Sequence, residues 1–273
     1  MRKKLSLLIA ASLSAIMLLS GCTAKGGSSK GTFKVGMEAG YAPFNWTQMN
    51  ESNGGVKIQG SSDYAGGYDV EIAKKIADSL GKELVIVKTE WEGLIPALTS
   101  GKIDAIIAGM SPTEKRKEAI DFSDNYYTSD LVMVVKKGGK YDGATSIQDF
   151  SGAKITAQLN TFHYTVIDQI KGVDKQTAMD NFPAMRVALE SGKIDGYVSE
   201  RPEGVSAEAA NSNFKMIEFT TGFETSPEDT AIAVGLKKGS DLTEKINEAL
   251  ANISEDERKQ IMDNAIKNQP ANE

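Results

Sequence analysis

The sequence has 273 residues, with 37 acidic and 31 basic side chains and a formal net charge of −6. This acidic balance argues against a surface for nucleic acid or anionic membrane. One cysteine and one histidine exclude an intramolecular disulfide and a thiolate zinc cluster, and they leave little general-base chemistry. Hydrophobic residues make up 40% of the chain, enough for the cores of two medium-sized domains.

The N-terminus has the pattern of an export signal. Three basic residues at 2–4 precede the apolar run 5–19, which is shorter than the roughly 20 residues that a spanning helix needs. The run ends in Leu-Ser-Gly-Cys22, which resembles the bacterial lipobox, where the cysteine is lipidated and cleavage occurs before it. We therefore predict a signal peptide at 1–21, lipidation of Cys22 and a small, polar, flexible tether at 22–32. The alternative is an ordinary free cysteine.

The chain beyond the tether alternates strand patterns with helix patterns. Five segments predict, in order, strand, helix, strand, helix and strand: 33–37, 68–80, 84–87, 91–98 and 103–108. Such alternation predicts a parallel sheet with right-handed crossovers.

One octapeptide occurs twice. Residues 97–104 read Ala-Leu-Thr-Ser-Gly-Lys-Ile-Asp, and residues 188–195 differ from them only by Glu for Thr. We interpret each copy as a helix end, a glycine and a strand. Gly101 and Gly192 then stand where a helix C-cap needs left-handed backbone.

The second copy predicts a second sheet of the same kind. The strand after it is expected at 194–198, and 153–157 and 215–219 are further strand candidates. The tail at 242–266 is predicted to be helical, with Ser254 as an N-cap and an apolar face that a lobe must cover.

These elements predict an α/β fold of two lobes, each with a parallel-type sheet. Lobe 1 is expected to comprise 33–130 and 226–273, and lobe 2 to comprise 131–225. Two crossovers would then form a hinge near 126–130 and 226–230, with a cleft between the lobes.

Ligands of open parallel sheets bind beyond the C-terminal ends of the strands. The first repeat strand leads to Gly109 and Ser111, with Arg116 shortly after, and the second leads to Glu200. This set suits a zwitterion, because Arg116 can hold a carboxylate bidentately while Glu200 and the Gly109 carbonyl accept from an ammonium. Opposite charges on opposite lobes would favour closure.

Five stretches together resemble the polar amino acid-binding proteins of ABC importers, bacterial extracellular solute-binding protein family 3. They lie at 35–44, 67–73, 91–98, 108–116 and 120–127. The resemblance covers nearly the whole mature chain. Its most specific parts are Ala-Gly-Met-Ser-Pro-Thr-Glu-Lys-Arg116 and the Asp-Phe-Ser block that begins at Asp121.

This resemblance implies a two-lobed, periplasmic-binding-protein-like fold and a function. The protein would capture an L-amino acid by lobe closure and deliver it to an ABC permease in the cytoplasmic membrane. It would act as a lipid-anchored monomer on the outer face of that membrane. No enzymatic activity, cofactor, metal or nucleic-acid partner is expected.

The resemblance also implies a ligand-binding set. It comprises Glu38, Tyr41, Trp91, Gly109, Met110, Ser111, Arg116, Thr161, Phe162 and Glu200. Tyr41 and Trp91 match aromatics that sandwich the ligand side chain. Thr161 and Phe162 match a second-lobe loop that completes the carboxylate site. Glu38 matches an acidic position that reaches the distal end of the ligand.

Three features depart from the family pattern. Asn160 replaces a glycine before the loop threonine, and asparagine tolerates left-handed backbone. Glu200 is longer than the usual aspartate. Residues 47–65 form a longer insertion than usual, expected to be a hairpin near the cleft mouth.

Each site residue also has a structural interpretation. Tyr41 and Trp91 would be core aromatics, Arg116 a solvated helix residue and Glu38 a strand end that faces water. For His163, the only histidine, we expect a loop or helix-surface position rather than a ligand contact.

Two other functions are compatible with the fold, a sensory ligand-binding protein and a carboxylate-using dehydratase. Neighbouring permease and ATPase genes would favour import, and turnover of a cyclohexadienyl acid would favour the enzyme. The ligand expected first is arginine, because Glu38 and flat aromatics favour a guanidinium. Lysine or histidine follow, and glutamine or glutathione remain open.

Overall fold

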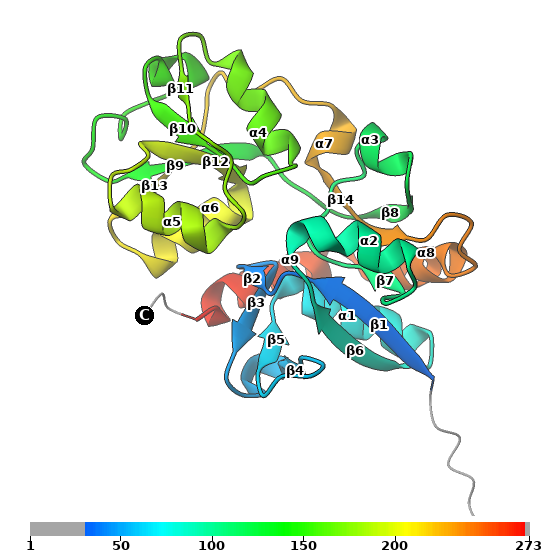
Figure 1. Ribbon diagram of the computed structural model, residues 1–273. Helices are drawn as coiled ribbons and strands as arrows, with labels where there is room; N and C mark the ends of the chain where they lie inside the picture. The colour runs from blue at the N-terminus through cyan, green and yellow to red at the C-terminus, as the bar shows by residue number, and fades with distance from the viewer. Residues whose placement is uncertain (1–30, 271–273) are drawn as a thin grey trace, which may run out of the picture.

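The computed structural model describes residues 31–270, which form two lobes joined side by side (Figure 1). Each lobe is built on a five-stranded sheet with helices packed against it, so the expected two-lobed α/β fold is confirmed. The signal peptide, Cys22 and nearly all of the tether lie outside the described residues. Within residues 31–270, none of the helices combines the length and apolar character that crossing a membrane requires.

The first sheet has the strand order β6-β1-β7-β14-β8. Its strands are β1 (Thr32–Met37), β6 (Glu83–Lys88), β7 (Ala105–Ile106), β8 (Asp121–Thr128) and β14 (Ala231–Leu236). Its helices are α1 (Tyr68–Ser79), α2 (Leu94–Thr99), α3 (Glu114–Lys117), α8 (Thr243–Ala251) and α9 (Glu255–Asn268), and a 3-10 turn at Trp91–Gly93 leads into α2. The apolar residues of α1 at helical spacing are buried, and Gly81, just beyond the helix end, adopts the left-handed conformation.

The insertion forms part of a small four-stranded antiparallel sheet on the flank of lobe 1 (Figure 1). Its order is β2-β3-β5-β4, and the strands are β2 (Gly40–Tyr41), β3 (Asn45–Gln48), β4 (Val56–Lys57) and β5 (Tyr64–Gly66), with a 3-10 turn at Ser52–Gly54. Trp46 on β3 is buried and donates from Nε1 to Gln48 Oε1 at 2.8 Å.

The second sheet has the order β11-β10-β12-β9-β13. Its strands are β9 (Leu131–Lys136), β10 (Lys154–Thr156), β11 (Asp174–Lys175), β12 (Gly196–Glu200) and β13 (Phe214–Ile217). The helices of this part are α4 (Phe162–Val166), α5 (Phe182–Glu190), α6 (Arg201–Ala210) and α7 (Pro227–Thr230), with 3-10 turns at Ile147–Phe150 and Ile167–Gln169.

Both sheets are mixed, so the expectation of parallel-type sheets was wrong in part. β1 runs parallel to β6 and β7, and β10 runs parallel to β11 and β12, because helical crossovers connect such strands. β14 and β9, the strands that follow the two crossovers, run antiparallel to their neighbours. A short apolar run in the sequence does not reveal the direction of its strand.

Several element boundaries differ from prediction by one or two residues. β7 is shorter than expected, β12 begins two residues late, and the helical tail is broken into α8 and α9. The break precedes Ser254, whose side chain accepts from Glu257 N at 3.2 Å and caps α9 as predicted. Gly101 (φ +78°) and Gly192 (φ +74°) adopt the predicted left-handed conformation.

The chain crosses between the sheets twice, after β8 and through α7, and the two crossovers contact each other. Ser129 N donates to Thr230 O at 3.0 Å. α9 packs against α1 in lobe 1 and against α6 in lobe 2, and Gln269 just beyond it donates from Nε2 to Ser206 O at 3.2 Å. The C-terminal helix therefore adds a third connection between the lobes, which consists of noncovalent contacts.

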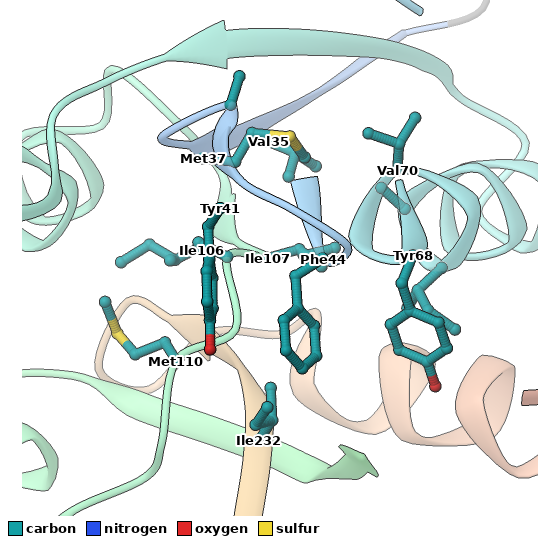
Figure 2. Close-up of a cluster of buried hydrophobic side chains, with 14 of the residues drawn as sticks. Val35, Met37, Tyr41, Phe44, Tyr68, Val70, Ile106, Ile107, Met110 and Ile232 are labelled. Carbon is teal, nitrogen blue, oxygen red and sulfur yellow. The ribbon is translucent and has the colours of Figure 1, made fainter. Parts of the chain in front are cut away.

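The core of lobe 1 lies directly behind the cleft. Figure 2 shows the Tyr41 and Phe44 rings side by side, with Met110 and Ile232 near them. Full burial of a large apolar side chain contributes about 1.5–3 kcal/mol. The cleft wall is thus held by the same aromatic residues that stabilise the lobe.

Candidate functional site

A cavity lies between the lobes, and each lobe provides half of its lining. Tyr41, Trp91, Gly109, Ser111 and Arg116 come from lobe 1, and Gln158, Thr161, Phe162, His163 and Phe182 come from lobe 2. The cavity lies at the C-terminal ends of β7 and β10, where sheets of this kind bind ligands. Seven of these ten residues were selected from the sequence and His163 was weighed there as a candidate; Gln158 and Phe182 were not considered.

Arg116 provides the positive charge of the cavity. Its Nη1 donates to Ser111 O at 2.9 Å, and its Nη2 donates across the cleft to Asn160 O at 3.3 Å. The guanidinium carbon lies 5.0 Å from the centre of the Trp91 ring, a cation–π distance. Burial lowers the pKa of Arg116 to about 10, so the group remains charged at neutral pH.

The Gly109 peptide is held by a buried network. Its N–H donates to Tyr126 Oη at 3.2 Å, and Tyr126 in turn donates to Asp69 Oδ1 at 2.7 Å. Asn45 Nδ2 donates to the other Asp69 oxygen at 2.8 Å. Glycine is needed here because φ is +63° and a Cβ would lie 2.7 Å from Tyr41 Cε1. Burial raises the pKa of Asp69 to about 7.

Two residues of this loop point elsewhere. The Met110 side chain packs into the core (Figure 2) and does not line the cavity. The Ser111 hydroxyl donates to Asp229 O at 2.9 Å, at the second crossover. The loop therefore presents mainly backbone groups to the cavity, besides the Arg116 guanidinium.

Glu200 provides the negative charge, at the junction of β12 and α6. It is 2% exposed, and its Oε1 lies 3.4 Å from His163 Nε2. Among residues 31–270, neither carboxylate oxygen has a hydrogen-bond partner, and the same holds for both His163 nitrogens and Tyr41 Oη. Burial, and then the charge of Glu200, raise the pKa of Tyr41, so its hydroxyl stays protonated.

The expectation for His163 was wrong. It is 6% exposed and lies in the first turn of α4, inside the cleft rather than on a surface. The cause is the preceding loop, in which Asn160 adopts the left-handed conformation (φ +56°), as predicted. Thr161 Oγ1 donates to Gln158 O at 2.7 Å, a bond that closes this loop just before α4.

Glu38 lies just after β1, next to Gln158, which lines the cavity. It is 7% exposed and accepts from Gln158 Nε2 of lobe 2, with both oxygens 3.1 Å away. Burial raises the pKa of Glu38 to about 7. The interpretation of Glu38 as a strand end that faces water is therefore wrong.

Phe182 closes the cavity beside Glu38. Its ring stacks on Tyr41 across the cleft, with centroids 4.4 Å apart and planes inclined by 14°. Asn181 accepts from Ala184 N and caps α5, and Pro183 fits the helix start, so Phe182 is fixed at the first helical position. The Asn-x-Pro pattern could have indicated the helix start in the sequence, but not what Phe182 contacts.

Comparison with known proteins defines the class. The model of the bacterial extracellular solute-binding proteins, family 3, matches residues 33–267, so the chain belongs to this family of substrate-binding proteins of amino acid ABC transporters.

Two relatives and one solved structure are similar along much of the chain. A probable histidine-binding protein of Campylobacter jejuni is 35% identical over 185 residues, 64% of this chain and 66% of that protein. The arginine-binding extracellular protein ArtP of Bacillus subtilis is 29% identical over 266 residues, 93% of this chain and 94% of that protein. An amino acid ABC transporter substrate-binding protein from Streptococcus pneumoniae, solved with L-arginine, shares 27% identity with a TM-score of 0.77, covering 87% of this chain and 94% of that one.

Proposed function

We propose that the protein is the extracytoplasmic, lipid-anchored substrate-binding protein of an amino acid importer, and that it captures L-arginine or another basic amino acid. The observation that carries this is a pair of opposite charges on opposite lobes: Arg116 lines the cavity, and Glu200 is buried next to His163, which also lines it. Arg116 of lobe 1 suits an α-carboxylate, and Glu200 of lobe 2, buried without a partner among the described residues, suits an α-ammonium.

The distal end of the cavity supports a basic ligand. Glu38 is a buried acidic group whose only hydrogen bonds among the described residues come from one neutral amide, that of Gln158. A guanidinium or ammonium would supply the opposite charge, and Trp91, which lines the cavity, provides an aromatic side chain for the stem of the ligand to pack on. Relatives that bind arginine and histidine support the same choice.

Capture would proceed by hinge bending at the two crossovers, near 126–130 and 226–230, between a lobe of 33–130 with 226–273 and a lobe of 131–225. Three contacts across the cleft depend on closure: Tyr41 with Phe182, Glu38 with Gln158, and Arg116 with Asn160. The closed form would be what the permease recognises, and a ligand that bridges the opposite charges would favour it.

Calorimetry tests the function. The mature body, refolded to remove carried-over ligand, is titrated with the twenty amino acids, cystine and glutathione. Binding of arginine, lysine or histidine supports the proposal. Binding of a neutral amino acid or a peptide keeps the capture role and overturns the ligand choice. If none of these ligands gives a heat of binding, the proposed function is contradicted.

Replacing Glu38 with glutamine is expected to lower the affinity for cationic ligands selectively. Loss of a charged hydrogen bond costs about 1.5–3 kcal/mol, so affinity for L-arginine should fall by about tenfold or more. Affinity for L-glutamine, measured by the same calorimetry, should change little. Glu90→Gln, at an exposed position on the same rim, is the matched control. An equal loss for every ligand would remove the reason for choosing arginine.

Replacing Cys22 with serine is expected to release the protein from the membrane. Lipid chains supply about 0.8 kcal/mol for each buried CH₂ group, and no other anchor is proposed. Cell fractionation and labelling with palmitate check this, with Thr23→Ser as the control that keeps both anchor and label. A serine variant that stays with the membrane fraction would argue against lipidation at this position.

A further inference from the structure

The single histidine of this chain lies where the ligand's amino group is expected. His163 lines the cavity from the first turn of α4, and its Nε2 lies 3.4 Å from Glu200 Oε1. The ring packs on Phe162, with centroids 4.3 Å apart. On the opposite lobe, Tyr41 lies close enough to Glu200 for the charge of this carboxylate to act on its hydroxyl.

The polar atoms at this point have no partners among residues 31–270. These atoms are both nitrogens of His163, both oxygens of Glu200 and the hydroxyl oxygen of Tyr41. A buried polar group without a hydrogen bond costs about 1–3 kcal/mol, and a buried charge costs more. The two carboxylate oxygens and one nitrogen of a neutral imidazole are acceptors, and together they suit a cation that carries several N–H donors.

A primary ammonium group matches this set. It has three N–H donors and no acceptor. The Glu200 carboxylate can accept one of them, and an unprotonated imidazole nitrogen can accept another. The Gly109 carbonyl, expected from the sequence to serve this group, remains available for the third. A protonated imidazole offers only donors and would repel the ammonium.

We propose that His163 is a member of the α-ammonium subsite together with Glu200, and that the ligand enters only when the imidazole is neutral, so that binding at mildly acidic pH releases one proton from His163 to solvent. This inference rests on the proposed function, because it presumes that an amino acid occupies the cavity.

The imidazolium of His163 and the ammonium group of the ligand would compete for one carboxylate, that of Glu200, because the surrounding charged groups have other partners. Ionisable side chains that interact with Glu200 or with its neighbours are Tyr41 on β2, Asp69 on α1, Arg116 on α3, Tyr127 on β8, Arg201 and Glu203 on α6 and Asp229 on α7. Glu203 is paired with Arg186, and Asp69 accepts from Tyr126 and Asn45. Arg116 would be held by the ligand's carboxylate. One carboxylate thus remains for two cations, the imidazolium and the ammonium.

This competition determines whether acid strengthens or weakens ligand binding. Above the titration of His163 the imidazole is neutral, and the ammonium takes Glu200 without opposition. Below it, the empty protein binds a proton that the complex excludes, so acid weakens ligand binding. One-proton linkage lowers the apparent affinity by about tenfold for each pH unit. Glu38 also titrates near neutral pH, so its contribution must be separated from that of His163.

Proton NMR observes the group directly. Because the sequence contains one histidine, tag-free protein gives one imidazole Cε1–H signal, which needs no assignment. We expect its titration midpoint to fall by about one pH unit or more when L-arginine saturates the protein. An unchanged midpoint in protein that binds L-arginine would overturn the inference and leave the proposed function intact.

Calorimetry of His163→Gln gives the second test. Glutamine keeps a neutral acceptor but does not titrate, while Glu38 is present in both proteins. Between about pH 7.5 and pH 5.5, wild-type affinity for L-arginine should fall about tenfold more than that of the variant. Parallel pH profiles would contradict the role of His163. If no amino acid binds the wild type at about pH 7.5, the proposed function fails, and this inference fails with it.

Discussion

Replacing Arg116 with alanine is expected to weaken L-arginine binding by about 3–5 kcal/mol, which is a loss of about a hundredfold to a few thousandfold. The guanidinium is the one cationic group that lines the cavity in the described part of the chain. Without it, the ligand's carboxylate would be buried without an opposite charge. The variant also loses the bond to Asn160 across the cleft and the stack on Trp91, both of which favour closure.

Isothermal calorimetry at low salt measures this effect, and two variants of the same short helix control for it. Arg116→Lys keeps the charge but loses the planar fork, so it should fall between wild type and alanine. Lys115→Ala removes an exposed charge from α3 and should bind almost as the wild type does. Affinity of Arg116→Ala within about tenfold of wild type would refute the carboxylate assignment.

Replacing Glu203 with alanine is expected to lower the free energy of unfolding by about 3–5 kcal/mol, the second large effect. Glu203 is fully buried, and its Oε1 accepts from Arg186 at 2.8 and 3.0 Å and from Tyr197 Oη at 3.0 Å. Arg186 also donates to Ser206 Oγ at 3.1 Å. Arg186 lies on α5, and its side chain is only 11% exposed. Removing the Glu203 carboxylate would leave this guanidinium without its anionic partner.

Urea denaturation followed by circular dichroism measures this loss. The double variant Glu203→Leu with Arg186→Met removes both charges and should recover most of the stability, because no unpaired ion remains. Asp168→Ala removes an exposed partner of Lys175 and should cost only about 0–1 kcal/mol. If Glu203→Ala unfolds at the same urea concentration as wild type, the buried pair does not stabilise lobe 2.

Local patterns in the sequence were sufficient for α1 and for several helix caps, whereas α3, α4, α6 and α7 were not predicted. The spacing of Val70, Ile72 and Ile76 predicted α1, and the repeated octapeptide placed Gly101 and Gly192 at helix ends. These signals succeed because they depend on contacts within a few residues. Strand direction depends on pairing between distant segments, so the antiparallel placement of β9 and β14 was not predictable in this way.

The same distinction between local and long-range contacts separates the site residues that could be predicted from those that could not. Residues that follow a strand end in a repeated unit, such as Gly109, Arg116 and Glu200, could be selected from the sequence. Gln158 and Phe182 could not, because each has its role only through a partner on the other lobe. Gln158 contacts Glu38 across 120 positions of the sequence, and Phe182 contacts Tyr41.

The two tryptophans of the chain lie in settings that suit optical measurements. Trp46 is buried in the flanking sheet, is bonded to Gln48 and lines a pocket that Glu38 also lines. Trp91 lies under the guanidinium of Arg116, so any ligand that engages this cation changes the electric field at the indole. Intrinsic fluorescence would therefore report occupancy without an attached dye. Trp46→Phe would reduce the emission to one tryptophan, and stopped-flow mixing could then follow the rate of capture directly.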